Sequence, residues 1–292
     1  MKLDFGTFLL QWATGGLLFL WVTTRRREVG IGYGWLLRGV FGLFAVGAVA
    51  VFATRSSDAH RGAADVALLA SVGMVLAAVV ALAVSIARRK AGVRGQLANR
   101  DRKRARVAAM VSGGPDRETE TADEVHADEF PPALDLVAPA LGAIGLLAAA
   151  VFAGGPYPLA AVRLLVGAAF LGAVSDAMLL GHWYLVQPGL RRDPLRQLVI
   201  ANALLWPIEV IAFLWPTGMI QVFSGTIDDG YGGLLAWVWL VSAVTTIGLI
   251  GVTWLALRER YYSAVMAATG LLYLAILTAF GTDLVARAVL SP

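Results

Sequence analysis

The sequence of 292 residues contains no cysteine and only three histidines. Without cysteine the chain cannot form disulfides, thiolate zinc sites or iron–sulfur ligation, and it has no thiol nucleophile. A bis-histidine haem needs two histidines in apolar segments, and only His182 lies in one, because His60 and His126 fall in polar connections. HExxH zinc, phosphate-loop and GxSxG nucleophile motifs are absent as well. We therefore expect no bis-histidine haem, and no motif names a reaction.

Charge is also scarce. Charged residues make up 15% of the chain and hydrophobic residues 58%, with a mean hydropathy of +0.71. Soluble domains carry about 25% charged and roughly 45–50% apolar residues, so this composition is typical of membrane proteins. The net charge of +4 comes from basic residues that lie between apolar runs. We therefore interpret them as topology signals and expect no nucleic-acid partner.

Eight apolar segments are long enough for a transmembrane helix, which takes about 20 residues. Helix is expected because every backbone polar group in lipid must be paired within its own segment, and no segment alternates like a barrel strand. The predicted fold class is all-α, a polytopic transmembrane helical bundle of about eight spans. The predicted spans are 5–23, 33–53, 63–87, 134–153, 158–186, 198–216, 234–257 and 264–284.

The basic residues alternate from one connection to the next. The connections after the first, third, fifth and seventh spans hold most of the 24 Lys and Arg residues, and the others hold few. The positive-inside rule then predicts that both termini are non-cytoplasmic, in the cell (plasma or inner) membrane. A cleaved signal peptide is the alternative for the first span, but one Lys2 precedes it and three arginines, Arg25–Arg27, follow it, which favours an uncleaved helix.

One long polar segment interrupts the spans. It divides the chain into residues 1–87 with three spans, the charged cytoplasmic linker 88–133, and residues 134–292 with five spans. The linker is basic up to Arg106 and acidic from Gly113 to Glu129. It is either a helix extension followed by a disordered tether, or a basic surface for anionic lipid or a partner. The basic residues singled out for that surface are Arg88, Arg89, Lys90, Arg102, Lys103 and Arg104.

Ionisable residues inside spans are costly and tend to face the bundle interior. Asp176 follows the small residues Ala168 and Gly172 at four-residue spacing, a stripe that lets two membrane helices approach closely. Near the membrane faces, Arg38, Arg163 and Asp65 are expected to reach headgroups by snorkelling. Asp283 and Arg287, four residues apart, are expected to pair with each other.

The fifth and sixth spans are predicted to form an antiparallel hairpin through the turn-forming segment 188–194. Counted from that turn, His182 is expected at the depth of Asn202, and Asp176 at the depth of Glu209, two turns deeper. Pro207 removes a backbone donor just before Glu209. These residues form a candidate polar column, which either joins the helices by hydrogen bonds, carries protons or ions, or holds a quinone-like ligand. Its aromatic neighbours are Trp183, Tyr184 and Trp206.

The glycine-bearing run Gln11-Trp12-Ala13-Thr14-Gly15-Gly16, together with the count of eight spans, resembles quinol-interacting membrane anchors of molybdenum oxidoreductases. The resemblance covers this one helix, and it implies contact with quinol.

Three functions remain open at this stage. The leading one is a membrane subunit or scaffold without catalytic activity, in an electron-transfer complex whose quinone His182 would hold against Trp183 and Tyr184. The alternative is a proton- or ion-coupled secondary transporter that uses Asp176 and Glu209. A membrane enzyme acting on lipids is third. The expected partners are membrane lipids, anionic ones at the cytoplasmic face, and other membrane or peripheral subunits.

Overall fold

The computed structural model describes residues 4–26, 28–55, 60–89, 107–108 and 130–290. Within these residues the chain is helical and contains no strand, and eight helices are long and apolar enough to cross a membrane. The predicted all-α fold with eight candidate spans is confirmed. The helices are α1 (Phe5–Thr24), α2 (Ile31–Ala53), α3 (Arg61–Ala87), η2 (Pro132–Leu136) leading into α5 (Val137–Ala149), α6 (Tyr157–Val186), α7 (Asp193–Leu214), α8 (Met219–Phe223), α9 (Leu234–Ala256) and α10 (Tyr262–Val289).

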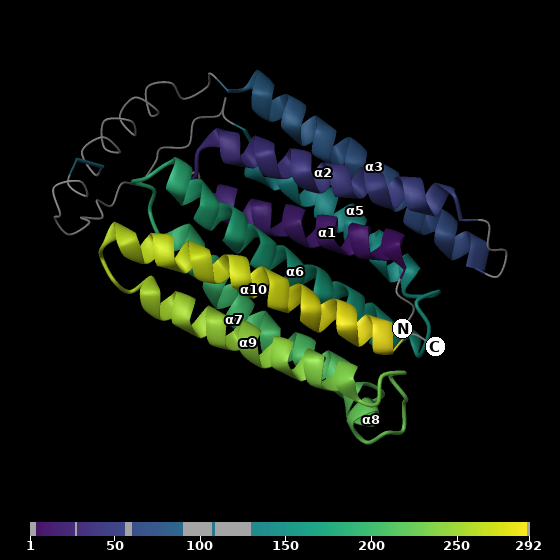
Figure 1. Ribbon diagram of the computed structural model, residues 1–292. Helices are drawn as coiled ribbons and strands as arrows, with labels where there is room; N and C mark the ends of the chain where they lie inside the picture. The colour runs from purple at the N-terminus through teal and green to yellow at the C-terminus, as the bar shows by residue number, and fades with distance from the viewer. Residues whose placement is uncertain (1–3, 27, 56–59, 90–106, 109–129, 291–292) are drawn as a thin grey trace.

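The bundle has two ends that differ in character. α1 begins and α10 ends at one of them, the terminal end (Figure 1). At the opposite end lie the connections α1–α2, α6–α7 and α9–α10, residues 25–30, 187–192 and 257–261. These connections carry the arginine clusters of the sequence, so we call this the arginine end.

The eight long helices pack as two groups of four (Figure 1). α1, α2, α3 and α5 contact one another, and α6, α7, α9 and α10 form the second group. α5 packs against α3 and α1 although it follows the charged linker. The boundary between the groups therefore falls between α5 and α6, and the contact of α1 with α6 joins them.

Glycine makes the contact of α1 with α6 a backbone contact. A Cβ added at Gly15 would stand 1.7 Å from the carbonyl oxygen of Ala168, and one added at Gly172 would stand 2.1 Å from the carbonyl carbon of Gly15. The predicted role of the stripe Ala168–Gly172 in close helix approach is confirmed.

The exterior of the bundle is apolar. Leu43, Leu69, Leu204 and Leu277 are each 65–69% exposed. Exposed apolar surface of this extent is unfavourable in water, at about 25 cal/mol per Å², but it costs nothing against lipid tails. This exterior suits a protein that is surrounded by lipid.

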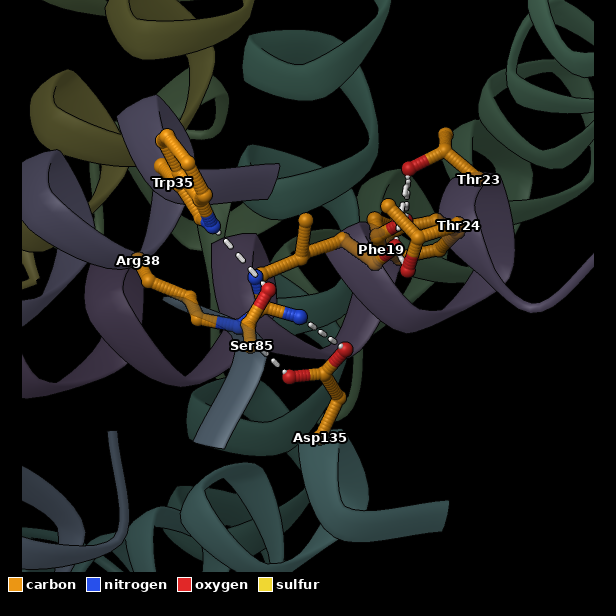
Figure 2. A network of polar contacts seen from close by, with 8 residues as sticks. Phe19, Thr23, Thr24, Trp35, Arg38, Ser85 and Asp135 are labelled. Carbon is orange, nitrogen blue, oxygen red and sulfur yellow. Dashed lines mark hydrogen bonds and ion pairs between the residues drawn. The ribbon is translucent and has the colours of Figure 1, made fainter. Parts of the chain in front are cut away.

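Two polar contacts tie the end of α3 and the short helix η2 to α2 (Figure 2). Trp35 donates to the Ser85 hydroxyl near the end of α3, at 3.0 Å. One turn further along α2, Arg38 forms a bidentate ion pair with Asp135 of η2, at 2.8 and 2.7 Å. Arg38 is only 4% exposed, so the expectation that it snorkels to headgroups is wrong. A carboxylate from η2 neutralises it inside the bundle instead.

Arginines of the α6–α7 hairpin hold the end of α9. The Arg192 guanidinium donates to the backbone carbonyls of Glu259, Arg260 and Tyr261, and Arg196 donates to that of Leu257 at 2.8 Å. These carbonyls lie in the connection that follows α9, where the backbone has no helical partners, and the guanidinium groups supply donors. The arginines that predict topology thus also satisfy the backbone where α9 turns into α10.

At the terminal end, Asp229 orders the start of α9. Its carboxylate accepts the backbone N–H groups of Gly233, Tyr231 and Leu235, at 2.8, 3.0 and 2.9 Å. These hydrogen bonds, with that from Gly233 the largest contributor, lower the pKa of Asp229, because they stabilise the charged form.

Candidate functional site

Five buried polar side chains from four helices meet near the terminal end. They are Gln11 of α1, Arg163 of α6, Glu209 of α7, and Asp283 and Arg287 of α10, and we call them the terminal cluster. Each is at most 5% exposed. The charges of the four ionisable groups sum to zero when both acids are ionised, and this balance lowers the cost of burying them between apolar helices.

Each arginine of the terminal cluster has a defined partner. Arg287 donates from Nε to Asp283 at 2.7 Å, so the predicted pairing of these two residues is confirmed. Arg163 donates to the backbone carbonyls of Ala212 and Thr217 at 2.8 and 2.7 Å. Pro216 has no N–H and cannot serve the Ala212 carbonyl four residues earlier, so the guanidinium takes that place. Arg163 is therefore a structural residue inside the bundle and does not snorkel.

Glu209 is fully buried and interacts electrostatically with Asp283, Arg287 and Arg163. A hydrogen bond between two carboxyl groups needs a proton on one of them. Neither Glu209 oxygen has a hydrogen-bond partner in the described part of the chain. Glu209 is therefore a buried carboxyl near a second acid, and its hydrogen-bonding capacity is unused within the described residues.

The terminal cluster is packed around Gly167. A Cβ added there would stand 2.1 Å from Gln11 Nε2, 3.0 Å from Asp283 Oδ1 and 3.2 Å from Arg287 Nη2. All three of these atoms are buried, and within the described residues none has a hydrogen-bond partner. The site therefore offers unused donors and acceptors at a point where not even a methyl group fits.

Asp176 forms a second, separate acidic site on α6. It is fully buried, and among the described residues neither carboxyl oxygen has a hydrogen-bond partner. The Tyr33 hydroxyl of α2 donates to the backbone carbonyl of Asp176 at 3.4 Å, and Trp12 of α1 donates to the neighbouring Ser175 at 2.8 Å. Asp176 thus lies where α6 meets α1 and α2, and not in the α6–α7 hairpin alone.

The expectation that Asp176 and Glu209 share a depth is wrong. Glu209 belongs with the groups around Gly167, nine residues and about 13 Å along α6 from Asp176. The error comes from the hairpin, because α7 begins at Asp193, five residues earlier than predicted. Tyr184 donating to the Arg191 carbonyl and Arg163 donating to the Ala212 carbonyl set the register of the two helices.

The other members of the predicted column are also apart. His182 is exposed, and its Nδ1 hydrogen bonds to the Tyr273 hydroxyl of α10 at 3.0 Å. Asn202 is fully buried, donates to its own helix at the Leu198 carbonyl at 2.9 Å, and keeps its oxygen without a partner in the described part of the chain. The predicted column is thus replaced by two acidic sites and an exposed histidine.

The aromatic neighbours are divided between the two ends. Trp183 packs against Tyr33, with ring centroids 5.8 Å apart, and Tyr184 is buried beneath the arginine end. Trp206 donates to the Ala243 carbonyl of α9 at 2.9 Å. It also lines an apolar groove of about 370 Å³ between α7, α8 and α9, together with Phe223, Trp237 and Trp239.

The proposed lipid-facing basic segment is described only in part. Arg88 and Arg89 are exposed at the end of α3. Lys90, Arg102, Lys103 and Arg104 lie outside the described residues. Among the described residues, no group of three or more His, Asp and Glu side chains could hold a metal ion.

Sequence reasoning missed two site residues, Gln11 and Tyr33, and it also missed Asp135, the ion-pair partner of Arg38. Gln11 has a visible signal, since it is the one amide side chain in the first span and lies one turn before Gly15 on the same face. Tyr33 and Asp135 lie at predicted helix ends, where polar side chains are ordinary, so only the packing shows what they contact.

The fold and the two acidic sites define an all-helical protein with eight candidate spans and buried carboxyl groups between its helices. No family model, curated protein or solved structure matches the chain.

Proposed function

We propose that this is a multi-pass protein of the cell membrane that conducts protons through its helical bundle, with both termini outside and the arginine end in the cytoplasm. The observation that carries the proposal is the burial of two acids, Glu209 and Asp283, in one charged cluster, where both Glu209 oxygens and Asp283 Oδ1 have no hydrogen-bond partner in the described part of the chain. The alternation of arginine-rich connections supports the orientation.

The crowding of the site favours a proton over a larger substrate. A methyl group at position 167 would already overlap Gln11. Uptake of a proton needs no space, and it changes the net charge of the four ionisable groups from zero to plus one. Buried acids that served only to hold helices together would be expected to use their oxygens in hydrogen bonds. Those of Glu209 and Asp176 are unused within the described residues.

Asp176 is the second proton-binding position in this proposal. It lies about 13 Å from the terminal cluster, too far for direct transfer. Water molecules between the helices carry the proton from one acidic site to the other. Unpartnered buried groups such as the Asn202 oxygen offer these waters the hydrogen bonds they require.

The test is proton flux in liposomes that contain the purified protein, driven by a potassium diffusion potential and followed by an enclosed pH dye. The pH inside liposomes that contain the wild-type protein should change much faster than the pH inside empty liposomes. Glu209→Gln and Asp283→Asn should each lower the rate by about a hundredfold, because an amide cannot release a proton. The control is Asp65→Asn, since Asp65 is exposed on α3. Wild-type rates equal to those of empty liposomes, or full rates in both amide variants, would contradict proton conduction.

A quinone-linked membrane subunit is the second candidate, and the aromatic groove between α7, α8 and α9 favours it. Four aromatic side chains line an apolar space of about 370 Å³, which suits a flat lipid-soluble ring. His182, by contrast, lies on another face of the bundle, where its ring is hydrogen-bonded to the Tyr273 hydroxyl. Equilibrium binding of a short-chain benzoquinone in detergent, weakened by Trp237→Ala and unaffected by His182→Ala, would support this candidate. Equal binding to wild type and Trp237→Ala would remove it.

A further inference from the structure

The connection between α9 and α10 gathers positive charge at the arginine end. Arg258 and Arg260 belong to this connection and are exposed. Beneath it, Arg192 donates to three of its backbone carbonyls and Arg196 donates to a fourth. Carbonyl oxygens would repel an anion, but these four already accept hydrogen bonds from guanidinium groups. The acid of the connection is the exposed Glu259, so the four arginines leave an excess of positive charge there.

The two exposed guanidinium groups are not neutralised by carboxylates of the described chain. In the neighbouring connection Arg191 pairs with Asp193 at 2.9 Å, whereas Arg258 and Arg260 form no ion pair within the described residues. Arg258 lies instead over Trp254 of α9, with its guanidinium carbon 3.5 Å from the ring centroid. A guanidinium stacked on an aromatic ring keeps the N–H groups at its edge available for a phosphate.

The side chains along this end of α9 are arranged in the order of the parts of a lipid molecule. Val252 and Leu255 are 51% and 54% exposed, Trp254 is 37% exposed, and Arg258 lies one turn beyond the tryptophan. Apolar side chains suit acyl chains, tryptophan is enriched at the membrane interface, and arginine reaches the headgroups. Tyr261, which is 61% exposed, adds a second aromatic side chain beside the arginines.

We propose that Arg258 and Arg260, with Trp254 and the apolar side of α9 next to them, bind the phosphate of an anionic phospholipid. The excess of positive charge favours an anionic lipid over phosphatidylcholine, whose choline group carries a positive charge close to its phosphate. Lipid binding here requires only that the helices lie in a membrane, so it is independent of proton conduction. The site also lies outside the charged linker, where the sequence alone places a basic surface for lipid.

The test is tryptophan fluorescence of the full chain in phosphatidylcholine vesicles that contain increasing fractions of dibrominated phosphatidylglycerol. Dibrominated phosphatidylcholine is the comparison lipid. Bromine quenches tryptophan on contact, and the part of the quenching that is lost in Trp254→Phe reports on this site. In wild type, the brominated anionic lipid should quench Trp254 at a lower mole fraction than the brominated zwitterionic lipid.

Two variants test the arginines. Arg258→Gln and Arg260→Gln should each raise the mole fraction for half-quenching by about fivefold, the factor expected for one basic residue near an anionic membrane surface. The control is Arg61→Gln, which also removes an exposed arginine, but at the start of α3 near the terminal end. It should leave the mole fraction unchanged. If one of the two variants fails to fold, the other decides.

Three results would overturn the proposal. The first is equal half-quenching fractions for the two brominated lipids in wild type, and the second is an unchanged fraction in the arginine variants. The third is an equal loss in Arg61→Gln, which would show attraction by net charge without a site on α9. Inorganic phosphate should weaken the quenching no more than chloride does at the same ionic strength. A stronger effect of phosphate would identify the free ion, and not the lipid, as the bound anion.

Discussion

At the scale of single residues, glycine determines how closely the polar groups approach. Because Gly167 has no side chain, the polar ends of Gln11, Asp283 and Arg287 can approach it together. Gly15 and Gly172 allow the backbones of α1 and α6 to come into contact. An added methyl group at these positions meets other atoms below normal contact distance. At Gly172 these are backbone atoms, which cannot move aside as a flexible side chain can.

Gly172→Ala and Gly167→Ala should therefore each lower the free energy of unfolding, by about 1–3 kcal/mol. The loss should be larger at Gly172, because its neighbours are backbone atoms of Gly15. Gly248→Ala is the control, since an added Cβ there meets nothing within 4 Å in α9. Thermal or denaturant unfolding in detergent measures the three variants. Equal stability of Gly172→Ala and Gly248→Ala would contradict the backbone contact between α1 and α6.

At the scale of elements, ion pairs and backbone carbonyls hold the helices where the connections reach the arginine end. The Arg38–Asp135 pair joins α2 to η2, and both side chains are at most 3% exposed. Breaking a buried pair leaves one charge uncompensated, which costs about 3–5 kcal/mol.

We expect Arg38→Ala to lower stability by about that amount and to loosen the start of α5, measured as faster amide hydrogen exchange across residues 132–140. The partly exposed pair Arg55–Asp4, whose side chains are 25% and 22% exposed, supplies the control. Arg55→Ala should cost about 1 kcal/mol or less. Similar exchange across residues 132–140 in both variants would argue against a role of Arg38 in holding α5.

Sequence reasoning succeeds for elements and fails for their registers. The eight spans follow from the length of the apolar runs, and the small-residue stripe at Gly172 follows from spacing alone. The helix that packs against this stripe cannot be predicted from the sequence, because any helix with a small residue could pack there. The predicted depth of Glu209 is wrong because α7 starts at Asp193 and not at residue 198. A helix that starts earlier places each of its later residues further along the bundle. Gln11 and Tyr33 belong to α1 and α2, whose contact with α6 only the packing reveals.

At the scale of the whole molecule, the orientation can be read chemically because the chain has no cysteine of its own. A single cysteine placed at Tyr231, which is 68% exposed in the α8–α9 connection, should react in intact cells with a membrane-impermeant maleimide. One placed at Arg258, exposed in the α9–α10 connection, should react only after the cells are opened. The reverse pattern would place the arginine end outside.

Whether Glu209 and Asp283 share a proton, as we propose, is tested most directly by infrared spectroscopy of the purified protein near neutral pH, in the carbonyl-stretch region of protonated carboxyl groups. Wild type should show a protonated-carboxyl band that shifts on transfer to deuterated water. The band assigned to this pair should change in both Glu209→Gln and Asp283→Asn, because each variant removes one member of the pair. It should remain in Asp65→Asn. A wild-type spectrum without any such band, or one that both amide variants leave unchanged, would contradict a proton held between Glu209 and Asp283.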